Sequence, residues 1–301
     1  MQKKNLSYAM MVSAMLLFGS IGVVRSFVPL PSATLAFFRG LIGSAVLLLV
    51  AVILRRPVLS KIMRKKLPLL ILSGAMIGLN WVFLFEAYRF TTVATATVCY
   101  YIAPLIAAVF AVFFFRERLT VKKGICLVGA LLGVCLVSGV IPFGANISKG
   151  VPFALLAACL YAGVMLINQR LKDLSAYEKT LPQLFFAALA VLPYALIKEG
   201  VSLPPLTLGE WALTLAMCVL QTGVAYALYF GACGRLSTLS VGALSYIDPA
   251  FAVLLSAVAL LEPLTPWAWV GAALTLLSAA LFDIPLKRKT LEKEKEDERS
   301  L

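Results

Sequence analysis

The chain has 301 residues, of which 61% are hydrophobic and only 14% charged, and its formal net charge is +13. A soluble domain is about half apolar and about one quarter charged, and a soluble fold of this size cannot bury so much apolar surface in one core. A bilayer accepts such a surface, so we expect a polytopic membrane protein. The Lys and Arg residues stand between apolar runs rather than along one face, which favours membrane orientation over nucleic-acid binding.

Histidine is absent, and the six cysteines fall inside apolar runs without a Cys-x-x-Cys pair. The chain therefore lacks the commonest general base and metal ligand, and its cysteines are expected to pack as small hydrophobic residues. No His-Glu-x-x-His sequence and no phosphate-binding loop occurs either. We predict no metal site, no cofactor and no enzymatic or ATP-driven activity.

A transmembrane helix needs about 20 mostly apolar residues, and the chain offers ten such stretches. The first follows Gln2-Lys3-Lys4 and is too long for a typical signal peptide, so we interpret it as a retained span. The weakest separator between neighbouring stretches is Arg89-Phe90-Thr91-Thr92. The predicted spans are residues 7–28, 33–54, 67–89, 92–115, 120–140, 150–170, 180–198, 209–231, 237–261 and 267–286.

The basic residues test this count. With the N-terminus placed in the cytoplasm, 22 Lys and Arg residues fall on the inner side and four on the outer side, and Arg39 lies within a span. Such a bias follows the positive-inside rule and would collapse if an early span had been missed. We predict a multi-pass protein with both termini in the cytoplasm and a charge-dense, solvated tail at residues 287–301.

The two halves of the chain share a motif at a constant spacing of 145 residues. Tyr101-Ile102-Ala103-Pro104 matches Tyr246-Ile247-Asp248-Pro249, and beyond each proline follows Glu-x-Leu-Thr, at residues 117–120 and 262–265. Five spans in each half invert the second copy, and inverted repeats around a midplane site are typical of secondary transporters. We predict an all-α membrane protein with ten transmembrane helices as two inverted five-helix repeats, residues 1–145 and 146–286, before the tail 287–301.

These halves, with a proline in the fourth helix of each and Glu-x-Leu-Thr at its end, resemble the EamA family of the drug/metabolite transporter superfamily. Arg39 also matches the arginine usual in the second helix of that family. The resemblance covers residues 7–286. It implies a bacterial inner-membrane carrier of amino acids, amines, nucleobases or similar metabolites, with a cavity lined by the third, fourth, eighth and ninth helices. Because Pro263 follows Glu262 and no arginine matches Arg39 in the seventh helix, the site is expected to be asymmetric.

Asp248 is the only acidic residue near the predicted bilayer midplane, and its counterpart in the first half is Ala103. Ionisable groups at membrane depth usually face a cavity or a charged partner. The following residue, Pro249, donates no backbone hydrogen bond, which frees nearby carbonyl groups for a ligand or water. We expect Asp248 to contact a substrate amine or to carry a proton; the alternative is a structural acid that a neighbouring helix satisfies.

Arg39 lies about 9 Å into the second predicted span at 1.5 Å per residue. It could hold a substrate carboxylate by two parallel hydrogen bonds, or it could form a structural pair with Glu86. Glu86 precedes Arg89 by three residues, so an ion pair that reaches the membrane surface is the alternative to a gating role for Glu86.

Aromatic and amide residues complete the candidate site. Aromatic rings could surround an amine or stack on a flat ligand, and amides could bind polar groups, although packing and interhelical hydrogen bonding are the alternatives. The candidate substrate-binding residues are Arg39, Asn80, Trp81, Tyr101, Gln221, Tyr226, Tyr246 and Asp248. The candidate coupling or gating residues are Glu86 and Asp248.

Other patterns indicate packing before function. The pairs Gly74/Gly78 and Gly129/Gly133 allow two helices to approach closely. Glu117 and Glu262 lie at predicted helix ends, where capping or anchoring is favoured over substrate contact.

These features predict a secondary transporter, a permease or exporter of a small polar metabolite, that works by alternating access around a midplane cavity in the lipid bilayer. A non-transporting membrane receptor and an intramembrane enzyme are the alternatives. The substrate, the direction of transport, coupling to protons and assembly into a homodimer stay open at this stage.

Overall fold

The structure is a computed structural model, and within its described residues it contains helices and no strand. Described are residues 2–115, 121–138, 148–200, 205–233, 235–236 and 238–283.

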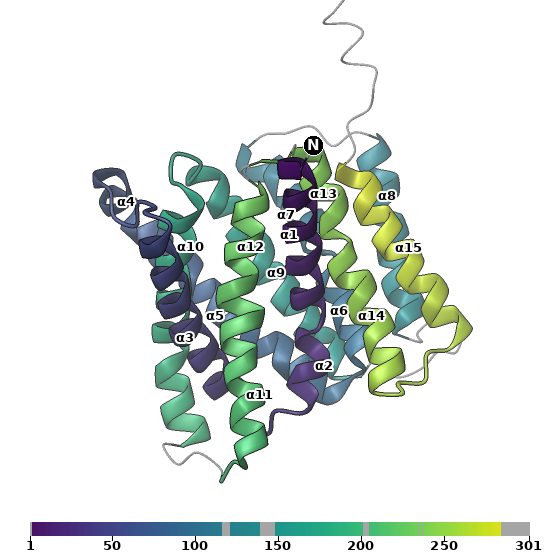
Figure 1. The fold of residues 1–301 in the computed structure, drawn as a ribbon. Coiled ribbons are helices and arrows are strands. Elements are labelled where there is room, and N and C mark those ends of the chain that lie inside the picture. The colour runs from purple at the N-terminus through teal and green to yellow at the C-terminus, as the bar shows by residue number, and fades with distance from the viewer. Residues whose placement is uncertain are drawn as a thin grey trace, which may run out of the picture.

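The helices of the first half run back and forth between two ends of the molecule (Figure 1). We call the end that carries the N-terminus the proximal face and the opposite end the distal face. The helices are α1 (Gln2–Gly19), α2 (Ile21–Ser26), α3 (Ser32–Ile53), α4 (Lys61–Lys65), α5 (Leu67–Phe90), α6 (Val93–Tyr100), α7 (Ala103–Phe115) and α8 (Val121–Val137).

The second half continues this course. Two of its elements are short π-helices, in which each turn holds one extra residue, and both continue an α-helix without a break. The elements are α9 (Gly150–Arg170), α10 (Ala176–Tyr194), η1 (Ala195–Glu199), α11 (Leu208–Cys218), η2 (Val219–Val224), α12 (Ala225–Cys233), α13 (Thr238–Ser245), α14 (Ile247–Ala259) and α15 (Pro266–Asp283).

Six helical segments of the described chain are long and apolar enough to cross a membrane: 5–26, 32–53, 67–90, 150–170, 176–199 and 208–233. They agree with six of the predicted spans. Large apolar side chains face outward along them; the exposed fraction of Leu49 is 60% and that of Ile53 is 68%. The predicted spans 92–115, 120–140, 237–261 and 267–286 correspond to shorter or interrupted helices, so a count of ten crossings stays a prediction.

Glycines let several helices pack backbone to backbone. A Cβ atom added to Gly78 would lie 2.5 Å from the carbonyl oxygen of Ala187 in α10, and one added to Gly133 would lie 2.6 Å from that of Gly271 in α15. Such contacts are closer than any side chain allows. The prediction that the two glycine pairs serve packing is therefore confirmed.

The duplicated motif is the place where two helices are interrupted. The fourth predicted span divides into α6 and α7 at Tyr101 and Ile102, and the ninth divides into α13 and α14 at Tyr246. Pro104 and Pro249 then lie in the first turns of α7 and α14, where a residue without an N–H group is tolerated. Asp248 therefore lies in the first turn of a helix, where the positive end of the helix dipole favours a carboxylate.

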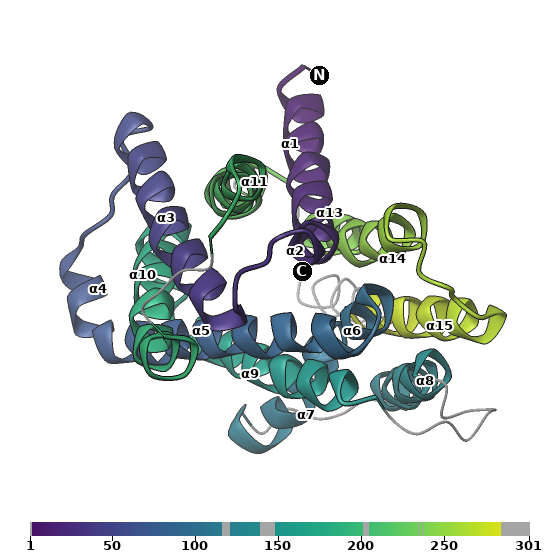
Figure 2. The same cartoon turned by 90° about the horizontal axis from the view of Figure 1, so that it is seen from below.

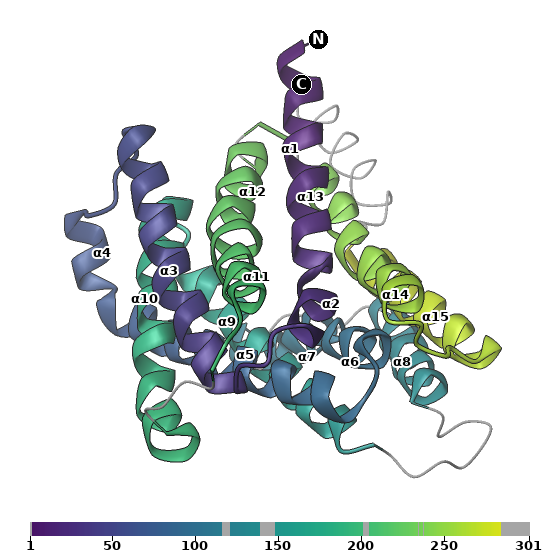
Figure 3. The same cartoon turned by 60° about the horizontal axis from the view of Figure 1, so that its bottom comes forward.

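The first and eighth predicted spans are also irregular near their centres. The first changes from α1 to α2 at Ser20, and the eighth contains the π-helix η2. Figures 2 and 3 show the segment α11–α12 standing between α3 and α1. Irregular backbone at membrane depth occurs where it is buried in protein or lines a cavity, so these positions mark the interior of the molecule.

Candidate functional site

A cavity of about 460 Å³ lies among helices of both halves. Residues of α1, α2, α3, α5, α6 and α7 contribute to its wall, together with residues of α9, α12, α13 and α14. Seven of the eight candidate binding residues line it: Arg39, Asn80, Trp81, Tyr101, Tyr226, Tyr246 and Asp248.

Arg39 of α3 is buried, with an exposed fraction of 3%, and its side chain is held at three points. Its Nε donates a hydrogen bond of 2.8 Å to the hydroxyl of Thr222, and its guanidinium carbon lies 4.4 Å from the ring centre of Trp81 and 5.7 Å from that of Phe85. Among the described residues its two terminal nitrogens donate no hydrogen bond. The planar end of Arg39 is therefore free to bind a carboxylate.

The alternative pairing of Arg39 with Glu86 is not formed within the described part of the chain. Glu86 instead accepts hydrogen bonds of 3.0 and 3.2 Å from Arg89, whose side chain is 58% exposed. This is the i,i+3 ion pair that the sequence allowed as the alternative to gating, and it lies at the end of α5. Glu86 does not line the cavity, so a gating role for it has no geometric support here.

Thr222 was not predicted. It lies within η2, is fully buried, and its hydroxyl is also 3.4 Å from the carbonyl oxygen of Met217, five residues earlier. The extra residue in a π-helix turn rotates the side chains that follow, and this rotation is what aims Thr222 at α3. The sequence carries no signal for a π-helical turn. A threonine in an apolar helix is usually expected to bond to its own backbone, so its contact with Arg39 could not be predicted.

Asp248 is joined to the first half of the chain. The hydroxyl of Tyr101 donates a hydrogen bond to its carboxylate. On the other side, a Cβ atom added to Gly19 would lie 2.5 Å from the carbonyl oxygen of Asp248, so α1 packs directly on the start of α14. The carboxylate lines the cavity while its backbone is held by a close helix contact.

The two candidate amides have different surroundings. Asn80 lines the cavity, but its Nδ2 donates a 2.6 Å hydrogen bond to the carbonyl oxygen of Ala157 in α9. Gln221 lies outside the cavity wall, and its Nε2 donates a 2.6 Å hydrogen bond to the hydroxyl of Ser20, at the junction of α1 and α2. Both amides therefore join helices, which was the alternative role considered for them.

Aromatic residues form much of the remaining wall. Tyr100 packs against Tyr101 and Tyr161, with ring centres 5.8 and 5.5 Å apart, and Tyr226 lies 5.1 Å from Phe18. The contributions of Phe18 and Tyr161, from the first and sixth predicted spans, were not predicted. A cluster of this kind can surround an amine or a flat ring.

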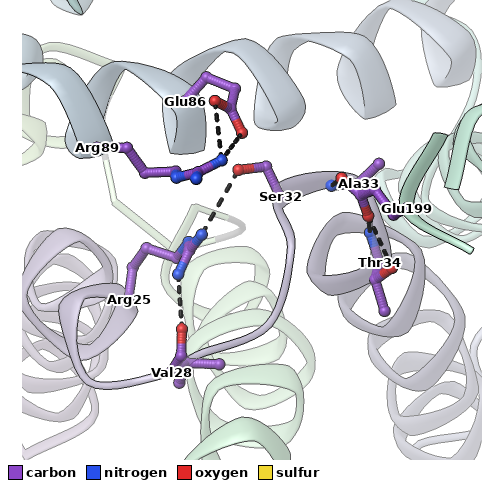
Figure 4. Close-up of polar contacts among 8 residues, drawn as sticks. All are labelled: Arg25, Val28, Ser32, Ala33, Thr34, Glu86, Arg89 and Glu199. Atoms are coloured by element: carbon purple, nitrogen blue, oxygen red, sulfur yellow. Dashed lines mark hydrogen bonds and ion pairs between the residues drawn. The ribbon is translucent and has the colours of Figure 1, made fainter. Parts of the chain in front are cut away.

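At the distal face, carboxylates of the second half hold helix starts of the first half. Glu262 accepts hydrogen bonds from the backbone N–H groups of Val93 at 2.7 Å and Ala94 at 3.3 Å. Glu199 likewise accepts from Ala33 at 2.9 Å and from the backbone and hydroxyl of Thr34 at 2.7 Å (Figure 4). Capping of a helix start is thus confirmed for Glu262. Its counterpart Glu117 lies outside the described residues.

The fold and its cavity define a class: a polytopic helical membrane protein whose two halves share a motif and together line one cavity. The sequence profile described as the EamA-like transporter family matches residues 5–139 and again residues 148–282. The chain belongs to this family.

Relatives named as transporters match this chain, and a solved structure shares its fold. The chain is 29% identical over 260 residues to the uncharacterized transporter YxxF of Bacillus subtilis (strain 168), covering 85% of this chain and 83% of that one. It is 29% identical over 194 residues to the pseudopaline exporter CntI of Pseudomonas aeruginosa (strain UCBPP-PA14), covering 64% and 65%. A protein of known crystal structure shares the fold with a TM-score of 0.65 at 22% identity, over 94% of this chain and 97% of that one.

Proposed function

We propose that this transporter is a secondary carrier that moves a small polar metabolite by alternating access around the central cavity. The observation that carries the proposal is that two ionisable side chains, Arg39 of the first half and Asp248 of the second, line one cavity. Charged groups are expensive at membrane depth, and they usually belong to substrate or ion pathways.

The chemistry of the wall supports a substrate with complementary charges. The free end of Arg39 suits a carboxylate, and Asp248 beside tyrosine rings suits an amine or a coupling proton. Amino acids meet both requirements, an amine would use Asp248 alone, and a nucleobase could use the aromatic wall. The relative named as a pseudopaline exporter supports an export direction.

Alternating access needs two halves that move against each other. In the proposed topology, residues 1–145 and 146–286 are inverted five-helix repeats of ten spans in the cell's inner membrane, with both termini and the tail 287–301 in the cytoplasm. Contacts between the halves occur at both faces: Glu262 with Val93 at the distal face, and Lys66 with Asp173, at 2.6 Å, at the proximal face. Each of these two contacts must break when the cavity opens to the face on which the contact lies.

The proposal is tested in two steps. A thermal-shift screen of the purified protein against amino acids, amines, nucleobases and sugars finds a ligand, because binding to the folded state raises the melting temperature. Flux of that ligand into proteoliposomes, with a pH gradient and without one, then measures transport and proton coupling. Binding without flux would instead identify a receptor, and chemical conversion of the ligand would identify an enzyme.

A further inference from the structure

We infer that Arg25, which lies outside the cavity wall toward the distal face, forms a second anion-binding subsite that takes the carboxylate of the solute as it passes to or from Arg39. The inference rests on the proposed carrier function and extends it to a residue outside the cavity wall.

Arg25 is a buried cation without an ion-pair partner among the described residues. Its exposed fraction is 7%, and within the described residues it forms no ion pair. Its Nη1 donates a 2.6 Å hydrogen bond to the carbonyl oxygen of Val28, its Nη2 lies 3.5 Å from the hydroxyl of Ser32, and its buried Nε has no partner there. A buried charge without compensation is strongly unfavourable unless something else binds it.

The nearby carboxylates are already bound by other groups. Figure 4 shows Glu86 directed at Arg89 and Glu199 directed at the start of α3, and among the eight residues drawn Arg25 is joined to Val28 and Ser32. Within the described residues, the positive charge of Arg25 is therefore left for an anion that these carboxylates do not supply.

The position of Arg25 relates it to Arg39. The guanidinium carbons of both arginines lie 5.7 Å from the centre of the same ring, that of Phe85, which is fully buried. Arg25 also follows Ile21 and Gly22, which line the cavity, by about one helical turn. Because neither Phe85 nor Arg25 lines the cavity, an anion released by Arg39 would reach Arg25 when α2 and α5 move apart.

The competing role for Arg25 is to hold the turn between α2 and α3 through the carbonyl oxygen of Val28. That role needs one hydrogen-bond donor, which lysine or glutamine could supply. It explains neither the buried Nε nor the unpaired charge.

The test measures whether a carboxylate protects Arg25 in the purified full-length protein. Phenylglyoxal modifies arginine side chains, and peptide mass spectrometry follows Arg25, Arg39 and Arg89 separately in one sample. The probe is benzoate, an aromatic carboxylate, and uncharged benzamide of nearly the same shape is the control. Arg89, exposed and paired with Glu86, is the internal reference.

We expect benzoate to slow the modification of Arg25 and Arg39 by at least about threefold and to leave Arg89 unchanged, because both buried arginines would hold the carboxylate. Benzamide should protect neither. If Arg25 resists phenylglyoxal altogether, or if benzoate protects Arg39 alone, Arg25 only holds the turn and the carrier proposal stands. If benzoate protects neither arginine, the subsite is refuted together with the carboxylate role of Arg39.

Discussion

The hydroxyl of Tyr101 donates a hydrogen bond to the carboxylate of Asp248, 147 residues further along the chain. Tyr101 lies at the interruption between α6 and α7. Asp248 is the second residue of α14, directly after the interruption between α13 and α14. The same motif thus interrupts one helix in each half, and the two interruptions meet at the cavity. A carboxylate that occurs in the second copy only is held by a tyrosine of the first.

This contact leads to a prediction for Asp248→Asn. The substitution keeps the size of the side chain and removes its charge, so expression and monodispersity should be retained. Concentrative uptake in proteoliposomes, or its dependence on pH, should be lost, because asparagine neither carries a proton nor attracts an amine. Tyr101→Phe, which keeps the ring and the carboxylate, should reduce transport without abolishing it. Normal transport by the Asn variant from mildly acidic to mildly alkaline pH would make Asp248 a structural residue.

Much of the site could be predicted because charges are rare in this sequence. Arg39 and Asp248 stand out from apolar surroundings, and the 145-residue repeat locates Tyr101 and Tyr246. All four line the cavity. Where composition is so apolar, the physical cost of a buried charge makes each one informative.

The parts that could not be predicted depend on local helix geometry. Gln221 and Thr222 are neighbours in η2, but Gln221 contacts Ser20 while Thr222 contacts Arg39. An α-helical projection cannot assign these directions, because the π-turn shifts the register. Arg25 is one of the four basic residues that the positive-inside count assigns to the outer side, and the fold shows that it is buried.

The contact of Gly19 with α14 leads to a stability prediction. Gly19→Ala adds a Cβ atom 2.5 Å from the carbonyl oxygen of Asp248. Because both atoms are fixed to helix backbones, the helices must shift to relieve this overlap. The expected destabilisation is about 1 to 3 kcal/mol, typical of overpacking. Gly124→Ala, where no atom of the described residues lies within 4 Å of the added Cβ, is the matched control and should leave the melting temperature in detergent equal or higher. Equal melting of the two variants would contradict the close helix contact.

The proposed topology can be tested independently of any substrate. Reporter fusions after Leu59 and at the C-terminus should be active as cytoplasmic markers, and one beside Ser148 should report the opposite side, because 22 of the basic residues would otherwise face outward. An external C-terminus would require an odd number of spans. It would contradict two five-helix repeats, whatever the transport assays show.

The last prediction concerns Thr222 as the residue that orients Arg39. Thr222→Val keeps the shape of the side chain but removes the hydroxyl that binds Nε at 2.8 Å, so the guanidinium should lose its fixed direction. A hydrogen bond to a charged group contributes about 1.5 to 3 kcal/mol, so we expect the affinity for a carboxylate ligand from the thermal-shift screen to fall by about tenfold or more.

Two comparisons separate orientation from a general structural effect. Thr222→Ser retains the hydroxyl and should bind almost normally, whereas Arg39→Lys should bind poorly because a point charge replaces the planar pair of donors. A background variant that keeps Trp81 as its only tryptophan adds a fluorescence signal, since the guanidinium carbon of Arg39 lies 4.4 Å from the centre of that ring. Its emission should shift in the Val variant and not in the Ser variant. Unchanged affinity and emission in Thr222→Val would mean that Trp81 and Phe85 alone hold Arg39 in place.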